Sequence, residues 1–298
     1  MQNIELLSET LNKEGLTDLL FDGCEAALAE INGRLVKVEN PFLDEESIQI
    51  WIKKLLSDWG ARLDLAKPIA EVTIPTEFGL LRIHAVLGGE CSTRTQISIR
   101  RHSITKLTLS DLVTRKTIDD SQLVLLKQII SSRDNFVIVG GTGSGKTTLL
   151  KALLEEVAQE RIITIEDAPE LDLGGNAVSL ITRSNNHEGV GQISLGGLLR
   201  ETLRMRPDRI VIGEARGEEL SVLLQALNTG HSGSGFTLHA NNYSEVQSRM
   251  LTILSGADVN HDFAKQLIRN SISWVIEVSR LNNARKVAAI KRMAETLG

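Results

Sequence analysis

The sequence predicts an α/β protein in which a domain with a parallel β-sheet follows a smaller α+β domain. In the second half of the chain, short apolar stretches alternate with longer stretches of helical spacing, as in a parallel sheet covered by helices. One of these apolar stretches runs directly into a glycine-rich loop. In the first hundred residues, strand and helix patterns are mixed without that alternation, which is typical of an α+β domain.

The length of 298 residues favours two domains. An apolar content of 42% is enough for a packed core and argues against disorder. Around residues 103–120 the chain is rich in Thr, Ser and Asp and has little periodic hydrophobicity. We therefore predict an N-terminal domain over residues 1–106, a linker over 107–120 and a second domain, the one with the parallel sheet, over 121–298.

The first domain is expected to begin with a short helix that ends at Gly15. Asn32-Gly33 predicts a hairpin turn between the apolar stretches 17–21 and 35–38. Asp44 or Ser47 is expected to cap a helix whose apolar positions recur every three and four residues and share one buried face: Ile48, Trp51, Ile52, Leu55, Leu56 and Trp59. Three further strands are expected over residues 72–74, 80–86 and 95–100.

A phosphate-binding loop is the strongest signal in the chain. Residues 140–148 read Gly140, Gly141, Thr142, Gly143, Ser144, Gly145, Lys146, Thr147 and Thr148, which contains the pattern G-x-x-x-x-G-K-T. An apolar strand precedes the loop and a helix follows it, the context that this motif requires. Its backbone N–H groups and the start of the helix favour an anion, Lys146 is expected to reach the β- and γ-phosphates, and the Thr147 hydroxyl is expected to bind Mg²⁺. We therefore predict that ATP and Mg²⁺ bind here.

Polar side chains follow the other predicted strands of this domain at the point where each strand ends. Glu166 follows residues 161–165, Glu214 follows 209–212, and His239 follows 236–238. In open parallel sheets, ligands bind outside the carboxyl ends of the strands. We expect the loop, both carboxylates and the imidazole to lie along one edge of the sheet, next to the nucleotide phosphates.

ATP hydrolysis requires an oriented water and neutralisation of phosphate charge. Glu214 is a candidate to hold Mg²⁺ through water or to activate the attacking water, and Glu166 is a second candidate base. A structural carboxylate that caps a helix or forms an ion pair is the alternative for either residue. The residues do not show which of the two carboxylates acts as the base.

Two histidines and two arginines complete the candidate site. His239 follows a strand, and His231 lies in a glycine-rich loop where it could sense the γ-phosphate or contact a neighbouring subunit. Arg82 and Arg100 lie in the first domain, from which an arginine finger could reach the nucleotide. Satisfied structural histidines and solvated arginines at a sheet edge are the alternative interpretations.

The net charge of −5 argues against general nucleic-acid binding. No apolar stretch is long enough to span a bilayer, and the N-terminus has no pattern of a secretory signal. Cys24 and Cys91 are solitary, which favours reduced thiols. We expect a cytoplasmic protein.

The second domain resembles the type II/type IV secretion ATPases, the "traffic ATPase" superfamily, most closely the CpaF-type pilus ATPases. Its signatures occur in the family's order, namely the loop at 140–147, Thr164-Ile165-Glu166-Asp167, the run from Arg204 to Gly217 that contains Glu214, and the stretch from Thr229-Gly230-His231 to His239-Ala240-Asn241. The first domain is a weaker match, through the stretches that contain Arg82 and Arg100.

The resemblance implies a RecA-like P-loop NTPase domain and a homo-hexameric ring that binds nucleotide between its two domains, where Arg82 and Arg100 reach the phosphates. It also implies peripheral association with inner-membrane platform proteins of a pilus or secretion machine. Our first hypothesis is therefore a Mg-dependent ATPase motor for tight-adherence (Flp-like) pilus assembly or type II/IV secretion, with a conjugative secretion ATPase as the alternative. A nucleotide-responsive switch without turnover and a nucleic-acid translocase of related fold remain open.

Overall fold

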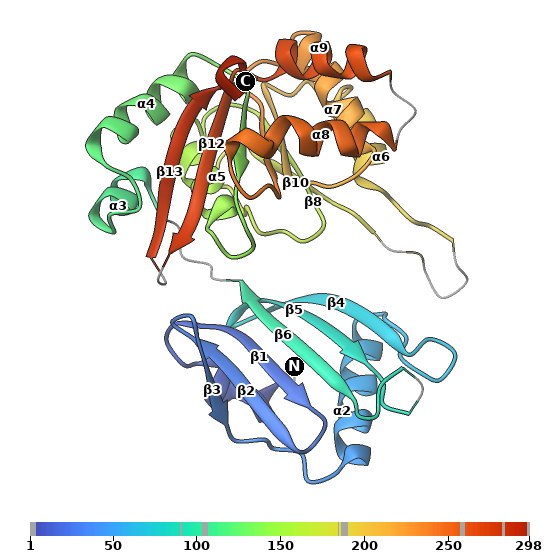
Figure 1. Ribbon diagram of the computed structural model, residues 1–298. Helices are drawn as coiled ribbons and strands as arrows, with labels where there is room; N and C mark the ends of the chain where they lie inside the picture. Colours follow the sequence, from blue (N-terminus) through green and yellow to red (C-terminus); the bar gives the residue numbers. More distant parts are fainter. Residues whose placement is uncertain are drawn as a thin grey trace. The chain divides into compact units, whose positions relative to one another are not determined.

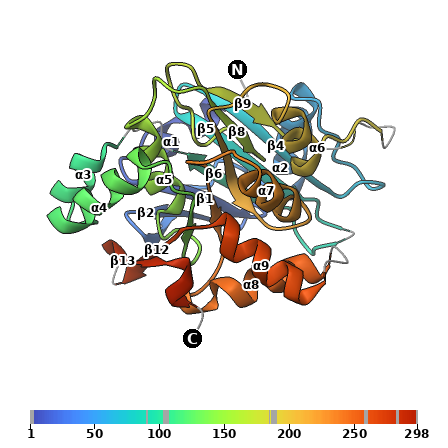
Figure 2. The same cartoon turned by 90° about the horizontal axis from the view of Figure 1, so that it is seen from above.

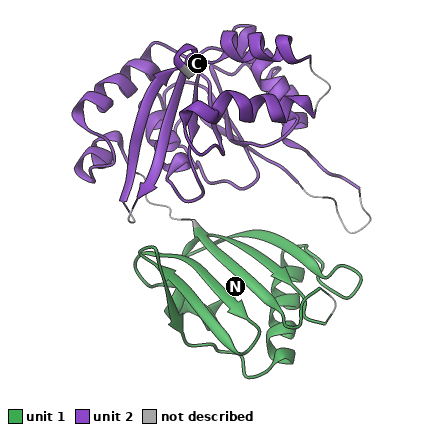
Figure 3. Cartoon of the chain, viewed as in Figure 1, with its two compact units in different colours: residues 1–105 green, residues 106–298 purple. Residues whose placement is uncertain are grey.

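The computed structural model describes residues 4–89, 91–102, 107–183, 185, 190–256, 260–281 and 284–296. The chain divides into two units, residues 1–105 and 106–298, each with a core of its own (Figure 3). No helix among the described residues has both the length and the apolar character that crossing a membrane requires.

The first unit is a six-stranded antiparallel sheet packed against a helix (Figure 1). Its sheet has the order β3-β2-β1-β6-β5-β4. The elements are η1 (Glu5–Leu7), α1 (Ser8–Leu11), β1 (Leu16–Asp22), β2 (Ala26–Ile31), β3 (Arg34–Val38), α2 (Glu45–Asp58), β4 (Ile69–Thr76), β5 (Gly79–Val86) and β6 (Gln96–His102).

Most local predictions for this unit are confirmed. Asn32 and Gly33 both have positive φ, 50° and 78°, and form the predicted turn, but the strand before the turn is β2; residues 17–21 belong to β1, which pairs with β2 and not with β3. Asp44 accepts a hydrogen bond from the backbone N–H of Ser47, and Ser47 caps in return, so both candidate caps act at the start of α2. Trp59 was expected on the buried face, but it follows the end of α2 and is 46% exposed.

The second unit is built on a seven-stranded sheet in the order β13-β12-β7-β11-β10-β8-β9. All neighbouring strands are parallel except β12 and β13. Its elements are α3 (Leu109–Thr114), α4 (Asp120–Ser131), β7 (Phe136–Val139), α5 (Lys146–Glu155), β8 (Ile162–Glu166), β9 (Val178–Ile181), α6 (Leu195–Thr202), β10 (Arg209–Ala215), α7 (Glu219–Asn228), β11 (Gly235–Leu238), η2 (Tyr243–Glu245), α8 (Val246–Ser255), α9 (His261–Ser271), β12 (Trp274–Leu281), β13 (Ala284–Arg292) and η3 (Met293–Thr296).

Helices cover both faces of this sheet. Phe136 and Ile138 of β7 belong to the core shared with α3, α4 and α5, whereas Val137 and Val139 belong to the core shared with α6 to α9. Figures 1 and 2 show the two groups of helices on separate sides of the sheet. The alternation explains why the central strands are apolar without interruption, since each strand buries both of its faces.

The segment 107–120, expected as a linker, belongs to the second unit. Thr108 and Asp111 form a capping box at the start of α3. Leu109, Leu112 and Ile118 are buried in the same core as α4 and α5. The many Thr, Ser and Asp residues that made this segment resemble a linker therefore include the caps of α3 and α4.

One arginine is fully buried at the amino end of β10. Arg209 is 1% exposed and donates both to the Glu160 carboxylate, at 2.9 and 2.8 Å, and to the carbonyls of Gly233 and Ile130, both at 2.9 Å. Hydrogen bonding to Arg209 holds the pKa of Glu160 below its usual range. This arginine ties β10 to the loop before β11 and to the end of α4.

We expect Arg209→Met to lower the free energy of unfolding by about 3 kcal/mol, because it leaves buried acceptors without a donor. Arg204→Met is the matched control: its ion pair with Glu201 is exposed, and its loss is expected to change stability by less than about 0.5 kcal/mol. Urea unfolding followed by circular dichroism measures both, and equal stability of the two variants would contradict the structural role of Arg209.

Candidate functional site

The phosphate loop lies between β7 and α5, as the sequence predicts. Gly140 and Gly145 have φ of 152° and 101°, in the region that favours glycine. A Cβ at Gly140 would lie 2.1 Å from the carbonyl oxygen of Val278, so no larger residue fits there. The side chain of Ser144 is buried, and its Oγ has no hydrogen-bond partner among the described residues. Such an orphaned polar atom in a glycine-rich cradle fits a loop shaped to receive a polar ligand.

Lys146 is folded over this loop. It is 7% exposed, and its Nζ donates to the carbonyls of Gly140 and Gly141, both at 3.0 Å. Burial lowers the pKa of Lys146, and the charges of Glu214 and Glu170 act in the opposite direction. A buried ammonium group held by carbonyl oxygens, with carboxylates nearby, can turn to a phosphate without crossing open solvent.

The predicted convergence of strand ends is present. β7, β11, β10 and β8 are consecutive and parallel, with Val139 opposite Leu238 and Ile212 opposite Ile165. The residues that follow these strand ends therefore lie at one edge: the loop after β7, His239 after β11, Glu214 near the end of β10 and Glu166 at the end of β8.

Glu214 and His239 form a direct pair. His239 Nε2 lies 3.0 Å from Glu214 Oε1, and Arg216 Nε lies 3.6 Å from Glu214 Oε2. Burial lowers the pKa of His239 and the charge of Lys146 lowers it further, while Glu214 acts in the opposite direction. A neutral imidazole that carries its proton on Nε2 can donate it to the carboxylate, which orients Glu214. The Glu214 side chain is 27% exposed, so water can reach it.

Glu166 lies at the predicted edge but differs from Glu214 in its surroundings. It is 3% exposed, and its Oε1 accepts from the backbone N–H groups of Glu170 and Leu171, at 3.2 and 3.0 Å. Burial raises the pKa of Glu166 to about 7, even though the N–H of Leu171 favours the charged form. Its contacts therefore hold the loop after β8 in place.

Some residues around the edge were not among the predicted site residues. Arg216 bridges Glu214 to Asp167, and Glu170 is close enough to Lys146 to influence its charge. Arg216 comes two residues after Glu214 and directly after the end of β10, and this position is the sequence signal that could have indicated the first of these contacts.

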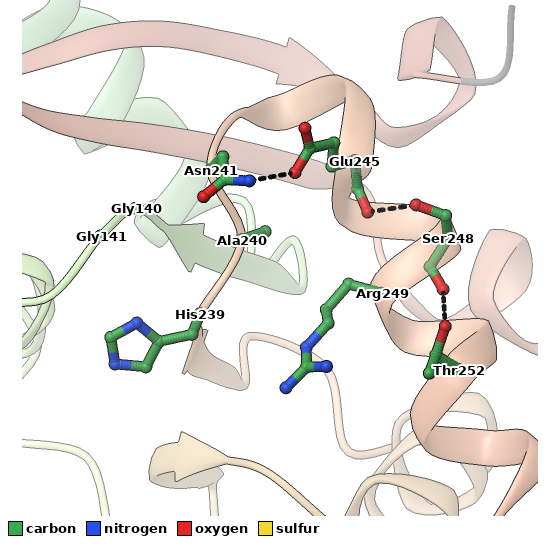
Figure 4. A pocket seen from close by; sticks show the side chains of 9 residues that line it. All are labelled: Gly140, Gly141, His239, Ala240, Asn241, Glu245, Ser248, Arg249 and Thr252. Atoms are coloured by element: carbon green, nitrogen blue, oxygen red, sulfur yellow. Dashed lines mark hydrogen bonds between the residues drawn. The ribbon is translucent and has the colours of Figure 1, made fainter.

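A pocket of about 390 Å³ opens beside the loop (Figure 4). It is lined by Gly140, Gly141, His239, Ala240, Asn241, Glu245, Ser248, Arg249 and Thr252. Figure 4 shows the Arg249 guanidinium extending from α8 toward the side where His239 lies. The pocket places polar and cationic groups next to the first glycines of the loop.

The remaining candidates lie elsewhere. His231 precedes β11, so it lies at the amino end of the sheet, opposite to the loop edge, and its Nδ1 is 3.1 Å from the Ala226 carbonyl at the end of α7. A γ-phosphate held by the loop of the same chain is therefore not within its reach. Arg82 and Arg100 are register partners on β5 and β6 of the first unit, where they pair with Glu71 at 2.7 Å and with Asp18 at 2.9 Å.

Comparison with known proteins decides the family. A family model described as "Type II/IV secretion system protein" matches residues 71–295. The chain belongs to this family. A putative conjugal transfer protein of Mycobacterium tuberculosis is 37% identical to it over 298 residues, which cover 97% of this chain and 82% of that protein.

Solved structures of similar fold include an ATPase and a pilus retraction motor. The VirB11 ATPase from the Brucella suis type IV secretion system, in complex with sulphate, is 23% identical with a TM-score of 0.51, covering 99% of this chain and 98% of that one. The pilus retraction motor PilT with bound ADP is 19% identical with a TM-score of 0.69, covering 96% and 80%. These likenesses confirm the predicted fold, a RecA-like domain with a smaller N-terminal domain. The CpaF-type resemblance stays a prediction.

The raised pKa of the buried Glu166 makes the free energy of unfolding depend on pH. Its pKa is higher in the folded than in the unfolded state, so the unfolded state binds fewer protons between about pH 4.5 and 7, and stability falls as the pH rises through that window. From pH 4.5 to 8 we expect the native protein to lose about 3 kcal/mol more stability than Glu166→Gln. Urea unfolding at both pH values tests this, and parallel pH profiles would contradict it.

Proposed function

We propose that this chain is an ATP-hydrolysing motor of a type IV secretion or conjugal transfer machine. The observation that carries the proposal is the convergence of the phosphate loop, Lys146, Glu214 and His239 at one edge of a single parallel sheet. Family membership supports the ATPase activity, because the solved relatives include a VirB11 ATPase and a motor with bound ADP.

The residues divide the chemistry of hydrolysis between them. The loop N–H groups and Lys146 bind the phosphates and offset their charge. Glu214 accepts the proton of the water that attacks the γ-phosphorus, and His239 keeps its carboxylate oriented. The Thr147 hydroxyl and Glu214 fit a Mg²⁺ ion, which takes few protein ligands and completes its shell with phosphate oxygens and water. When bound, that ion would neutralise charge that develops on the phosphates.

Glu214 is favoured over Glu166 as the base. Glu214 is partly exposed and its carboxylate is held by a neutral imidazole, whereas Glu166 is buried and occupied by backbone N–H groups. A base must reach the water that it activates. In this proposal Glu166 is a positioning residue that holds the loop carrying Asp167 and Glu170.

The conjugative branch is favoured over Flp-like pilus assembly by the names of the relatives. The Mycobacterium tuberculosis protein is described as a conjugal transfer protein, and VirB11 of Bartonella henselae, 28% identical over 97% of this chain, as a type IV secretion system protein. The partners in this proposal are inner-membrane components of such a machine, with the motor on the cytoplasmic side. No direct contact with nucleic acid is proposed, in keeping with the net charge of −5.

Glu214→Gln is the test of the chemistry. We expect it to bind ATP but to lose roughly 100-fold in the rate of phosphate release, about 3 kcal/mol in the barrier, because the attacking water loses its base. Glu218→Gln is the matched control, since Glu218 is an exposed carboxylate four residues further on. Phosphate release measured with purified protein compares them.

Lys146→Ala tests nucleotide binding, which an ATP titration measures beside the phosphate-release assay. It is expected to weaken or abolish ATP binding, because the phosphate charge is no longer offset. Normal turnover by Glu214→Gln would overturn its role as base, and tight ATP binding without any turnover by the native chain would favour a nucleotide-responsive switch.

We further propose a homo-hexameric ring in which Arg82 or Arg100 meets the nucleotide of the same or a neighbouring chain, and His231 meets that of a neighbouring chain. The position of His231 on the sheet edge opposite to its own loop supports contact with a neighbour. Sedimentation velocity is expected to show a hexamer when an ATP analogue is present. A monomer at every nucleotide concentration would contradict the ring.

A further inference from the structure

The hairpin formed by β12 and β13 lies against the phosphate loop. Arg285 Nε donates to the Gly143 carbonyl at 3.1 Å. A Cβ built on Gly145 would lie 3.2 Å from Cδ of Arg285, and one built on Gly143 would lie 3.4 Å from Nη1 of Arg280. Two arginine side chains therefore border the loop on the side away from β11.

The register of the hairpin explains this placement. Arg280 pairs with Arg285 and Val278 with Val287. Because side chains alternate along a strand, each arginine shares the face of its own strand's valine, and both valines are buried in the core shared with α3, α4 and α5. On this face of the hairpin, the two arginines lie next to the phosphate loop that precedes α5.

The hairpin is held in place from the same side. The backbone N–H of Val287 donates to the Thr117 carbonyl at 2.8 Å, and Gln122 Nε2 donates to the Val287 carbonyl at 3.0 Å. These bonds tie β13 to α4 and to the segment before it. These bonds lie two residues from Arg285 and anchor the strand that carries it.

The two arginines of this hairpin lie opposite each other in register. Like charges directly opposite in register destabilise a pair of strands. Within the described part of the chain Arg285 makes no ion pair with a carboxylate, and its partner is the carbonyl of an exposed glycine. Lys146 adds a third cation to the same loop. The guanidinium group of arginine matches the geometry of phosphate oxygens. A bound anionic ligand would therefore reduce the repulsion among these cations.

We propose that Arg285 and Arg280 bind the α- and β-phosphates of the nucleotide held by the loop of their own chain. The inference rests on the proposed function, because it takes ATP and ADP as ligands. It assigns a binding role to the C-terminal hairpin, separate from that of Arg82 and Arg100 in the first unit. On binding, Arg285 exchanges the Gly143 carbonyl for a phosphate oxygen, and the exposed carbonyl is left to water.

The test is the equilibrium affinity for ADP and for a non-hydrolysable ATP analogue, measured by titration calorimetry without turnover. We expect Arg285→Ala and Arg280→Ala each to weaken both ligands by the same factor, roughly tenfold, because both ligands carry the α- and β-phosphates. Arg285→Lys is expected to recover part of the loss, since it keeps the charge without the fork.

Lys286→Ala is the matched control. Lys286 is an exposed cation on the same strand but on the opposite face, and its replacement is expected to leave both affinities within twofold. The salt dependence of binding separates a phosphate contact from a structural effect: the loss of a contact makes the affinity of Arg285→Ala less sensitive to salt, and a distorted loop would leave the salt dependence unchanged.

Three results would overturn the inference: unchanged ADP affinity in both alanine variants, a loss confined to the ATP analogue, or unchanged salt dependence. Thermal unfolding without nucleotide verifies that the variants are folded, and Arg285→Gln, which keeps the length of the side chain, serves if the alanine variant is not. Failure of the native chain to bind ADP would instead overturn the proposed function itself.

Discussion

The parallel pairing of β7, β11, β10 and β8 is the constraint on which the site depends. Val139 lies opposite Leu238, so the loop and His239 begin at the same level of the sheet. A shift of one residue in this register would turn His239 and every core side chain of β11 to the other face. Because these strands bury both faces, such a shift would also disrupt two cores at once. The packing of the strands and the geometry of the site are therefore fixed by the same contacts.

The two edges of this sheet have different roles. At the amino ends, Arg209 is buried, makes four hydrogen bonds and joins β10 to α4 and to the loop before β11. At the carboxyl ends, the part of the chain that the structure describes offers no partner to the Ser144 hydroxyl, Lys146 donates to loop carbonyls, and charged side chains remain partly exposed. Satisfied polar groups at one edge keep the strands in register, and unsatisfied groups at the other are available to a ligand.

The sequence predicted the parts of the fold whose signals are local. The loop, the Asn32-Gly33 turn and the Asp44 cap each depend on a few neighbouring residues. β2 was missed because three of its six residues are alanine, which has low strand propensity, and it is a strand only because β1 and β3 pair with it. The β12–β13 hairpin was also missed, because charged residues that face the loop and the solvent interrupt its apolar pattern.

The site was predicted in its location and less well in its assignments. Strand ends showed that Glu166, Glu214 and His239 share an edge, because the rule for parallel sheets needs only chain order. Which carboxylate is buried depends on the path of the chain after each strand. The segment after β8 turns back so that its own N–H groups meet Glu166, and no spacing in the sequence encodes that turn. His231 was grouped with His239 because they are close in the sequence, although β11 carries them to opposite edges.

The contrast between the two glutamates follows from solvent access and hydrogen bonding together. Desolvation raises the pKa of Glu166 to about 7, so this carboxyl is partly protonated near neutral pH, and its Oε1 already accepts from two backbone N–H groups. Glu214 keeps access to water, and its partner His239 is held neutral by burial and by the nearby Lys146. A neutral imidazole can donate one proton to Glu214 without neutralising its charge. The Lys146 ammonium therefore acts on two groups. It lies where it can bind phosphate, and its charge favours the neutral form of His239, which leaves Glu214 able to accept a proton.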